Sequence, residues 1–121
     1  MRQFLILIVL CLLIGCSKIE PASGIYRISN DTESFTVLTL DSKNQSFVFC
    51  YDPLSSYLPC GTYTIKGNVL TAIAEDNADL YVFDIVDSST LQIRLQDSTM
   101  NCNDDRICGI PKESQQFTLQ E

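Results

Sequence analysis

From about residue 24 onwards, the chain is a succession of short segments in which apolar and polar side chains alternate. A period of two places one face of a β-strand in a core and the other in water. Leu91, Ile93 and Leu95 alternate with polar neighbours in the clearest segment. No helix-length stretch with a 3.6-residue period occurs there. Strands are predicted over Ile25–Ser29, Phe35–Leu40, Ser46–Tyr51, Gly61–Lys66, Val69–Ala74, Leu80–Val86, Thr90–Gln96 and Gln116–Gln120.

Turn-forming residues separate most of these segments. Gly67–Asn68 suits a two-residue hairpin connection, because both residues tolerate a positive φ. Eight strands joined mainly by tight turns favour an antiparallel meander that closes on itself and loses its exposed edges. The predicted fold is therefore all-β, a small eight-stranded meander barrel, with a two-sheet β-sandwich as the alternative. A barrel of this size holds either packed side chains or one small ligand.

The N-terminus differs from the rest of the chain. One basic residue, Arg2, precedes the apolar run Phe4–Ile14, which has 11 residues and is too short to span a bilayer as a helix. A basic start, a short apolar stretch and the small residue Gly15 are typical of a secretory signal peptide, here expected as an N-terminal signal helix. A cysteine, Cys16, follows directly.

The four residues Leu13–Cys16 resemble a bacterial lipobox, the end of a lipoprotein signal peptide. The resemblance implies that a diacylglyceryl group is joined to the Cys16 sulfur, that acyl chains such as palmitate anchor the protein, and that cleavage precedes Cys16. An ordinary cleaved signal peptide is the alternative. The predicted organisation is a signal peptide over residues 1–15, a lipidated tether over 16–23 and a β-barrel domain over 24–121. Ser17, a residue other than aspartate after the lipidated cysteine, favours the outer membrane of a two-membrane cell.

Two segments share the pattern G-x-Y-x-I, namely Gly24–Ile28 and Gly61–Ile65. A G-N-x-L-T hairpin and a Y-x-F-x-I strand follow the second. Over about Gly24 to Leu95 this arrangement resembles small lipocalin-like bacterial lipoproteins. The resemblance implies the barrel fold and carries no catalytic residue.

The charge of the chain restricts its partners. Eight basic and fifteen acidic residues give a net charge of −7, and no basic stripe is present that would bind nucleic acid. An anionic membrane surface would also repel the domain, so membrane attachment is expected through the N-terminal lipid. The acidic balance favours a monomer.

Four cysteines follow the signal segment: Cys50, Cys60, Cys102 and Cys108. An even number in an exported domain predicts two disulfides. Four cysteines allow three pairings, of which chain proximity favours Cys50–Cys60 with Cys102–Cys108. The spacings C-x₉-C and C-x₅-C do not match a structural zinc site, so no metal or other cofactor is expected.

No residue pattern points to catalysis. The chain contains no histidine, which excludes the common Ser-His and Cys-His nucleophile arrangements. Asp84 and the pair Asp104–Asp105 are candidates for paired carboxylate chemistry, but nothing distinguishes them from surface acids. The protein is therefore expected not to be an enzyme.

Six aromatic residues of the predicted strands are candidates to line a ligand cavity: Tyr26, Phe47, Phe49, Tyr63, Tyr81 and Phe83. The alternative is that they simply fill the core. The sequence thus predicts a non-catalytic cell-envelope lipoprotein that binds a small apolar ligand or an envelope protein. The alternative is an inhibitor of an extracellular hydrolase such as lysozyme, since an acidic surface suits a basic enzyme.

Overall fold

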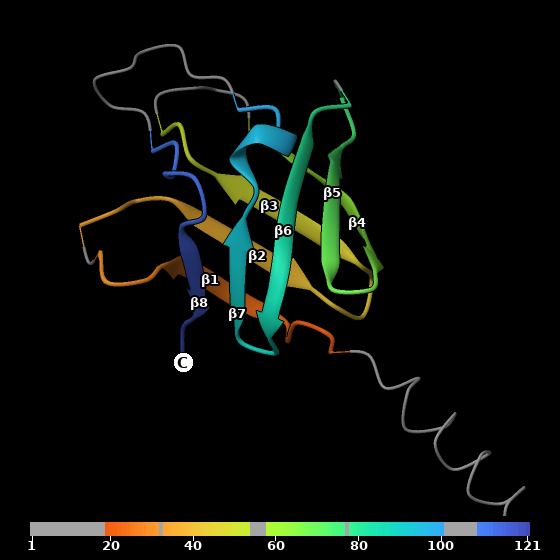
Figure 1. Cartoon of the computed structure of the whole chain (residues 1–121). Helices are drawn as coiled ribbons and strands as arrows, with labels where there is room; N and C mark the ends of the chain where they lie inside the picture. Colours follow the sequence, from red (N-terminus) through yellow and green to blue (C-terminus); the bar gives the residue numbers. More distant parts are fainter. Residues whose placement is uncertain (1–18, 32, 54–57, 77, 101–108) are drawn as a thin grey trace, which may run out of the picture.

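The chain forms a closed barrel of eight antiparallel strands, shown by a computed structural model (Figure 1). The structure describes residues 19–31, 33–53, 58–76, 78–100 and 109–121. The strands are β1 (Gly24–Ile28), β2 (Val37–Asp41), β3 (Ser46–Cys50), β4 (Cys60–Lys66), β5 (Val69–Ala74), β6 (Leu80–Asp87), β7 (Thr90–Ile93) and β8 (Gln116–Leu119). The predicted signal helix lies outside the described residues.

Closure of the barrel depends on the pairing between its first and last strands. Each strand pairs with the next one along the chain, and β1 also pairs with β8, where Tyr26 lies opposite Leu119. This cyclic pairing confirms the eight-stranded meander barrel and excludes the two-sheet sandwich. Among the described helices, none is long and apolar enough to cross a membrane.

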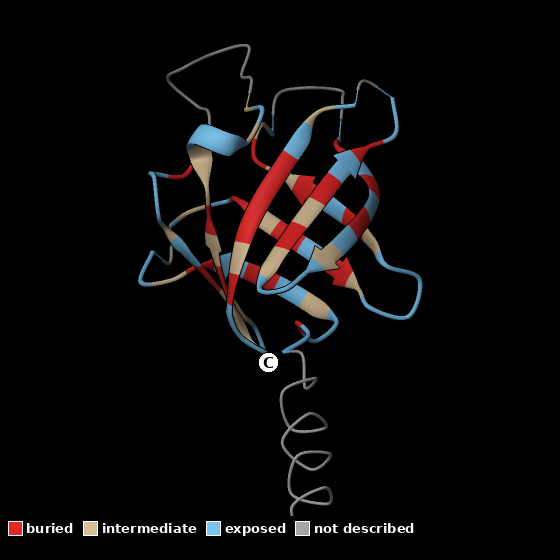
Figure 2. Cartoon of the chain, turned by 45° about the vertical axis from the view of Figure 1, so that its right-hand side comes forward, coloured by how far each residue is buried: buried red, intermediate tan, exposed pale blue. Residues whose placement is uncertain are grey.

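The interior is built from the residues that the alternation pointed inward (Figure 2). Phe47 and Phe49 of β3 are buried, while Val48 between them is exposed. Tyr81, Phe83 and Ile85 of β6 are likewise buried. The buried core consists of Tyr26, Ile28, Leu38, Leu40, Phe47, Phe49, Tyr51, Tyr63, Leu70, Ala72, Ala74, Tyr81, Phe83, Ile85, Leu91, Ile93 and Phe117. One contiguous apolar core of this kind supplies most of the driving force for folding.

Short polar turns connect the strands at one end of the barrel. Lys66 pairs with Val69, which confirms the predicted two-residue hairpin, and Gly67 takes a φ of 63°. In the β2–β3 turn, Asp41 Oδ1 accepts the backbone N–H of Lys43 at 3.1 Å. An aspartate that caps its own turn in this way favours chain reversal over strand continuation.

Two strand boundaries differ from the prediction by more than one residue. β7 ends at Ile93 rather than at Gln96, and a short 3₁₀-helix covers Leu95–Asp97. The Arg94 carbonyl oxygen accepts the Ser98 hydroxyl at 2.8 Å, and the Arg94 side chain bonds to Asp84. The Arg94 N–H still donates to the Val82 carbonyl oxygen at 2.8 Å, but the Val82 N–H donates to the Ser98 hydroxyl at 2.9 Å. The Ser98 hydroxyl thus replaces the return ladder bond between Val82 and Arg94.

The start of β2 is the second difference. β2 begins at Val37 rather than at Phe35. The side chain of Thr36 is fully buried and donates a hydrogen bond to the Gly109 carbonyl oxygen at 2.6 Å. Contacts with a distant segment therefore determine the backbone before Val37.

Gly61 provides a test of strand packing. A Cβ at this position would lie 2.1 Å from the Ile73 carbonyl oxygen, which belongs to the paired backbone of β5. We expect Gly61→Ala to lower the free energy of unfolding by about 1–3 kcal/mol, because backbone cannot move aside as a flexible side chain can. Urea denaturation would measure the loss. The neighbouring exposed substitution Thr62→Ala is the control, and an equal loss in both variants would contradict the steric explanation.

Candidate functional site

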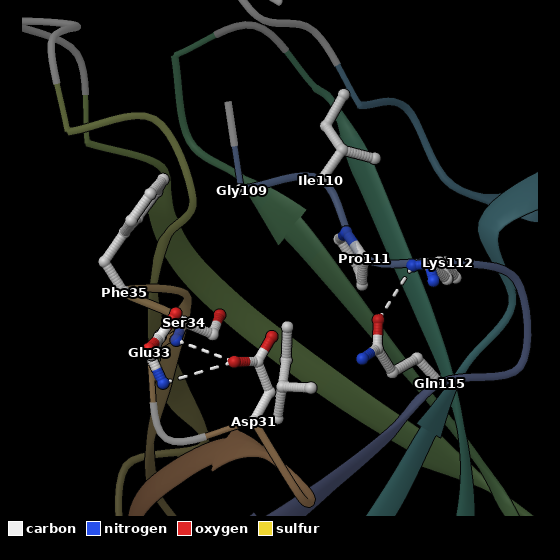
Figure 3. Close-up of a pocket in the computed structure, with 10 residues that line it drawn as sticks. Asp31, Glu33, Ser34, Phe35, Gly109, Ile110, Pro111, Lys112 and Gln115 are labelled. Atoms are coloured by element: carbon white, nitrogen blue, oxygen red, sulfur yellow. Dashed lines mark hydrogen bonds between the residues drawn. The ribbon is translucent and has the colours of Figure 1, made fainter. Parts of the chain in front are cut away.

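A groove lies at the end of the barrel opposite the short turns. It runs between the β1–β2 connection (residues 29–36) and residues 109–115, which precede β8 (Figure 3). Its volume is about 350 Å³. The lining comprises Ile28, Asp31, Glu33, Ser34, Phe35, Gly109, Ile110, Pro111, Lys112 and Gln115. A smaller depression of about 310 Å³ shares Ile28 and Asp31 with the groove and extends along β1 and β8.

Local hydrogen bonds shape the first wall of the groove. Asn30 has a φ of 63°, a conformation that asparagine adopts more readily than most residues. The Asp31 Oδ1 atom then accepts the backbone N–H groups of Glu33 at 3.2 Å and Ser34 at 3.1 Å (Figure 3). This turn presents the side chains of Glu33 and Phe35 at the groove.

Contacts between segments distant in sequence form the floor. The Gly109 N–H donates to the Tyr51 carbonyl oxygen at 2.7 Å, while the Gly109 carbonyl accepts the Thr36 hydroxyl. A Cβ at Gly109 would lie 2.2 Å from Thr36 Oγ1 and 2.7 Å from the Phe35 ring. Only glycine fits this position without displacing the Phe35 side chain.

The second wall is also held by its own bonds. The Lys112 N–H donates to the Gln115 Oε1 atom at 2.9 Å, and the Gln115 N–H donates to the Lys112 carbonyl at 3.1 Å. Pro111 is buried beneath this turn. Both walls are therefore hydrogen-bonded within themselves, so a ligand would meet a groove that is already formed.

The surface of the groove combines apolar and acidic groups. Phe35 and Ile110 are 40% and 37% exposed, one on each wall. Asp31 and Glu33 lie on one wall, and Lys112 lies on the other. The groove therefore offers two apolar contacts with an excess of negative charge beside them.

The six aromatic residues predicted to line a ligand cavity all lie inside the barrel and outside the groove. Their exposed fractions are 2% or less. Phe49 makes edge-on contacts with Tyr81 and Phe117, at ring-centroid distances of 5.2 Å and 6.0 Å, and Phe47 contacts Tyr81 at 6.0 Å. Rings in mutual contact fill space with the geometry that a core requires, which favours the core-filling interpretation of Tyr26, Phe47, Phe49, Tyr63, Tyr81 and Phe83.

The four predicted disulfide cysteines divide into two described and two undescribed residues. Cys50 and Cys60 have free thiols. Cys60 of β4 lies opposite Val48 of β3, and Cys50 lies two residues after Val48 on β3. The two cysteines are therefore diagonal neighbours across β3 and β4. Diagonal neighbours lie about 7–8 Å apart, beyond the usual Cα separation of about 4.4–6.8 Å in a disulfide. Cys16, Cys102 and Cys108 lie outside the described residues, and the two disulfides stay a prediction.

Of the candidate catalytic carboxylates, Asp84 is the one that the structure describes. Asp84 Oδ1 accepts hydrogen bonds from Arg94 Nη2 at 2.6 Å and Nε at 2.9 Å, with both side chains partly exposed. This pairing, chiefly the hydrogen bond, raises the pKa of the Arg94 guanidinium. Asp104 and Asp105 lie outside the described residues. Within the described part of the chain, no cluster of three or more His, Cys, Asp or Glu side chains is arranged to hold a metal ion.

Sequence reasoning did not find the groove. Asn30–Asp31 is a turn signal, but a turn by itself indicates no ligand. The other wall belongs to a stretch without strand alternation, and Gly109 shows its role only through contacts with Thr36 and Tyr51. Comparisons with protein-family models, curated proteins and solved structures gave no match. The function is therefore argued from the chain's own residues.

Gly109 allows the construction of the groove to be tested. We expect Gly109→Ala to lower the free energy of unfolding by about 1–3 kcal/mol, because the added Cβ collides with Thr36 and the Tyr51 carbonyl. The amide resonances of Phe35 and Thr36 should shift at the same time. The adjacent exposed substitution Ile110→Ala should change stability by less than about 0.5 kcal/mol. Unchanged Phe35 resonances in Gly109→Ala would show that the floor does not position that side chain.

A buried tyrosine predicts the alkaline behaviour of the barrel. Burial chiefly, with smaller contributions from Tyr63 and Asp87, raises the pKa of Tyr26 to about 12. The unfolded chain loses this proton near pH 10, so the stabilisation is complete below about pH 10 and is lost as the pH rises towards about 12. We expect the free energy of unfolding to fall over that range, and to fall less in Tyr26→Phe. Urea denaturation at several alkaline pH values would measure both, and identical slopes would contradict the assignment.

Proposed function

We propose that the protein is a lipid-anchored, non-catalytic binding module of the bacterial cell envelope, in which the groove receives a segment of another envelope protein. The proposal has two parts. The first is the anchor, a diacylglyceryl group on Cys16, supported by the lipobox-like residues Leu13–Cys16. The second is the groove, and the observation that carries it is the exposure of Phe35 and Ile110 across a preformed acidic depression.

A protein partner fits the groove better than a small apolar ligand does. The interior of the barrel is occupied by aromatic rings in contact with one another. The groove is open, its apolar residues stand on two walls, and acidic side chains lie beside them. Apolar anchors within a polar surround are typical of protein interfaces.

Charge specifies the class of partner. The chain carries a net charge of −7, and Asp31 and Glu33 outnumber Lys112 at the groove. Complementary charge accelerates association and discriminates against wrong partners. The occupant is therefore a segment that presents apolar side chains next to Lys or Arg. The protein acts from the cell envelope, in our proposal from the outer membrane, as a monomer without a metal or cofactor.

A binding role is also supported by how the described acidic groups are used. Asp84 is paired with Arg94, and Asp31 caps its own turn. With no histidine in the chain, the residue that most often carries protons near neutral pH is absent. These observations support a role without catalysis.

The second candidate function is inhibition of an extracellular hydrolase such as lysozyme. The same acidic groove favours it, because an acidic surface is complementary in charge to a basic enzyme. The two functions predict different results with a basic lysozyme as the probe. Loss of its cell-wall hydrolysis would support inhibition, whereas binding without loss of hydrolysis would support a partner of another kind.

The groove can be tested with a defined peptide. The probe is a short peptide of alternating Lys and Phe, titrated into isotopically labelled protein, with a Glu–Phe peptide of the same length for comparison. We expect the cationic peptide to shift the resonances of Phe35, Ile110 and Lys112, and to bind more weakly as salt rises. Phe35→Ala should weaken binding about 10-fold, equivalent to about 1.4 kcal/mol.

A matched surface variant is the control. Ile73 is 42% exposed on the outer face of β5, away from the groove, so Ile73→Ala should leave the affinity unchanged. Equal binding of the acidic and cationic peptides, or equal losses in Phe35→Ala and Ile73→Ala, would refute the groove as the binding site.

A further inference from the structure

The residues that precede β1 are bound to the barrel. Pro21 is buried, and the Ala22 N–H donates to the Ser88 carbonyl oxygen at 2.8 Å. The Tyr26 hydroxyl donates to the Ala22 carbonyl oxygen at 2.6 Å and lies 3.3 Å from that of Ser88. The last part of the predicted tether is therefore attached to the β6–β7 turn.

A second turn holds the same segment. The Ser23 hydroxyl oxygen lies 2.7 Å from that of Ser42 and accepts the Ser42 N–H at 2.7 Å. Ser42 belongs to the β2–β3 turn. We call Pro21–Ser23, together with Tyr26, Ser42 and Ser88, the clasp. In Figure 1 the chain before β1 lies beside the β6–β7 turn, at the end where the C-terminus also lies.

The clasp determines where an N-terminal anchor can sit relative to the barrel. Five residue steps separate Cys16 from Pro21, and a fully extended chain covers at most about 18 Å over that length. A strand of eight residues such as β6 is about 26 Å long. The chain before Pro21 leaves the barrel at the turn end, and a lipid on Cys16 stays within about 18 Å of that attachment, less than the length of one strand.

We propose that the clasp orients the barrel on the membrane, with the β2–β3 and β6–β7 turns facing the lipid surface and the groove facing away from it. This inference rests on the lipid attachment in the proposed function. Acidic residues such as Glu20, Asp41 and Asp87 at the turn end oppose insertion into an anionic surface, so the lipid alone holds this end at the membrane. The groove is thereby directed towards proteins in the aqueous phase.

Energy transfer from a single tryptophan to the membrane measures this orientation. The chain has no tryptophan, so Lys43→Trp in the β2–β3 turn and Asp76→Trp in the β5–β6 connection each introduce one donor, at opposite ends of the barrel. Both positions are exposed. Protein expressed from the full-length sequence in bacteria and purified from their membranes is reconstituted in phosphatidylcholine vesicles that contain dansyl-labelled phosphatidylethanolamine. We expect transfer to be about threefold or more stronger in Lys43→Trp, given the length of a strand.

A variant that weakens the clasp separates the effect of the clasp on orientation from the effect of the short tether. Pro21→Gly with Tyr26→Phe removes the buried ring and the hydroxyl donor, and we expect the ratio between the two donors to fall towards one. The matched control Ile73→Ala should leave the ratio unchanged. Equal transfer from both donors, or a ratio that the clasp variant does not alter, would overturn the proposal.

Flotation of the protein with the vesicles distinguishes the two levels of inference. Protein that does not float lacks the anchor, in which case the lipid attachment is refuted and the orientation with it. Protein that floats but transfers equally from both donors keeps the anchor and refutes the clasp as the orienting element.

Discussion

The ring of Phe49 makes the contact on which the closed barrel depends. It lies within 6.0 Å, centroid to centroid, of rings from β6 and β8 as well as of Tyr51 beyond the end of its own strand. Phe83 and Phe117 contact each other at 5.7 Å. These contacts connect β3 with β6 and β8, strands that do not pair with it, so they pack opposite sides of the barrel against each other. A register slip of one residue would turn such a ring outward, and filling the interior therefore also specifies the pairing.

Alternation in the sequence predicted the strands and their inward faces because a strand exposes successive side chains to opposite environments. The range of β5 was predicted as the structure has it, since a two-residue turn and a polar run limit it. The start of β2 and the end of β7 were not predicted, because Thr36 and Arg94 follow hydrogen bonds to Gly109, Asp84 and Ser98. Such partners are invisible to a local pattern.

The tether and the cysteines also show that a local sequence pattern does not reveal contacts between distant residues. Composition marked residues 16–23 as a linker, whereas Ala22 bonds to Ser88, a residue far along the chain. Proximity in sequence favoured a Cys50–Cys60 bond, whereas the register of β3 and β4 sets these residues diagonally. The number of residues between two positions limits how far apart they can lie. Which side chains come into contact is determined by how the strands pair, and a local sequence pattern does not show that pairing.

The topology of the meander explains how the proposed anchor and the proposed binding groove can share one small barrel. Successive connections of an up-and-down barrel alternate between its two ends. The connections with tight turns, at residues 42–45, 67–68 and 88–89, fall at one end, and the four longer ones, between β1 and β2, β3 and β4, β5 and β6, and β7 and β8, start and finish at the other. Longer loops on a rigid scaffold tend to carry binding residues, while the clasp needs the short turns for its bonds to Ser42 and Ser88. Because an even number of strands closes the barrel, both chain termini also lie at the short-turn end. The proposed N-terminal anchor therefore leaves the groove end unobstructed, and substitutions in the loops of that end could change the proposed partner without disturbing the attachment.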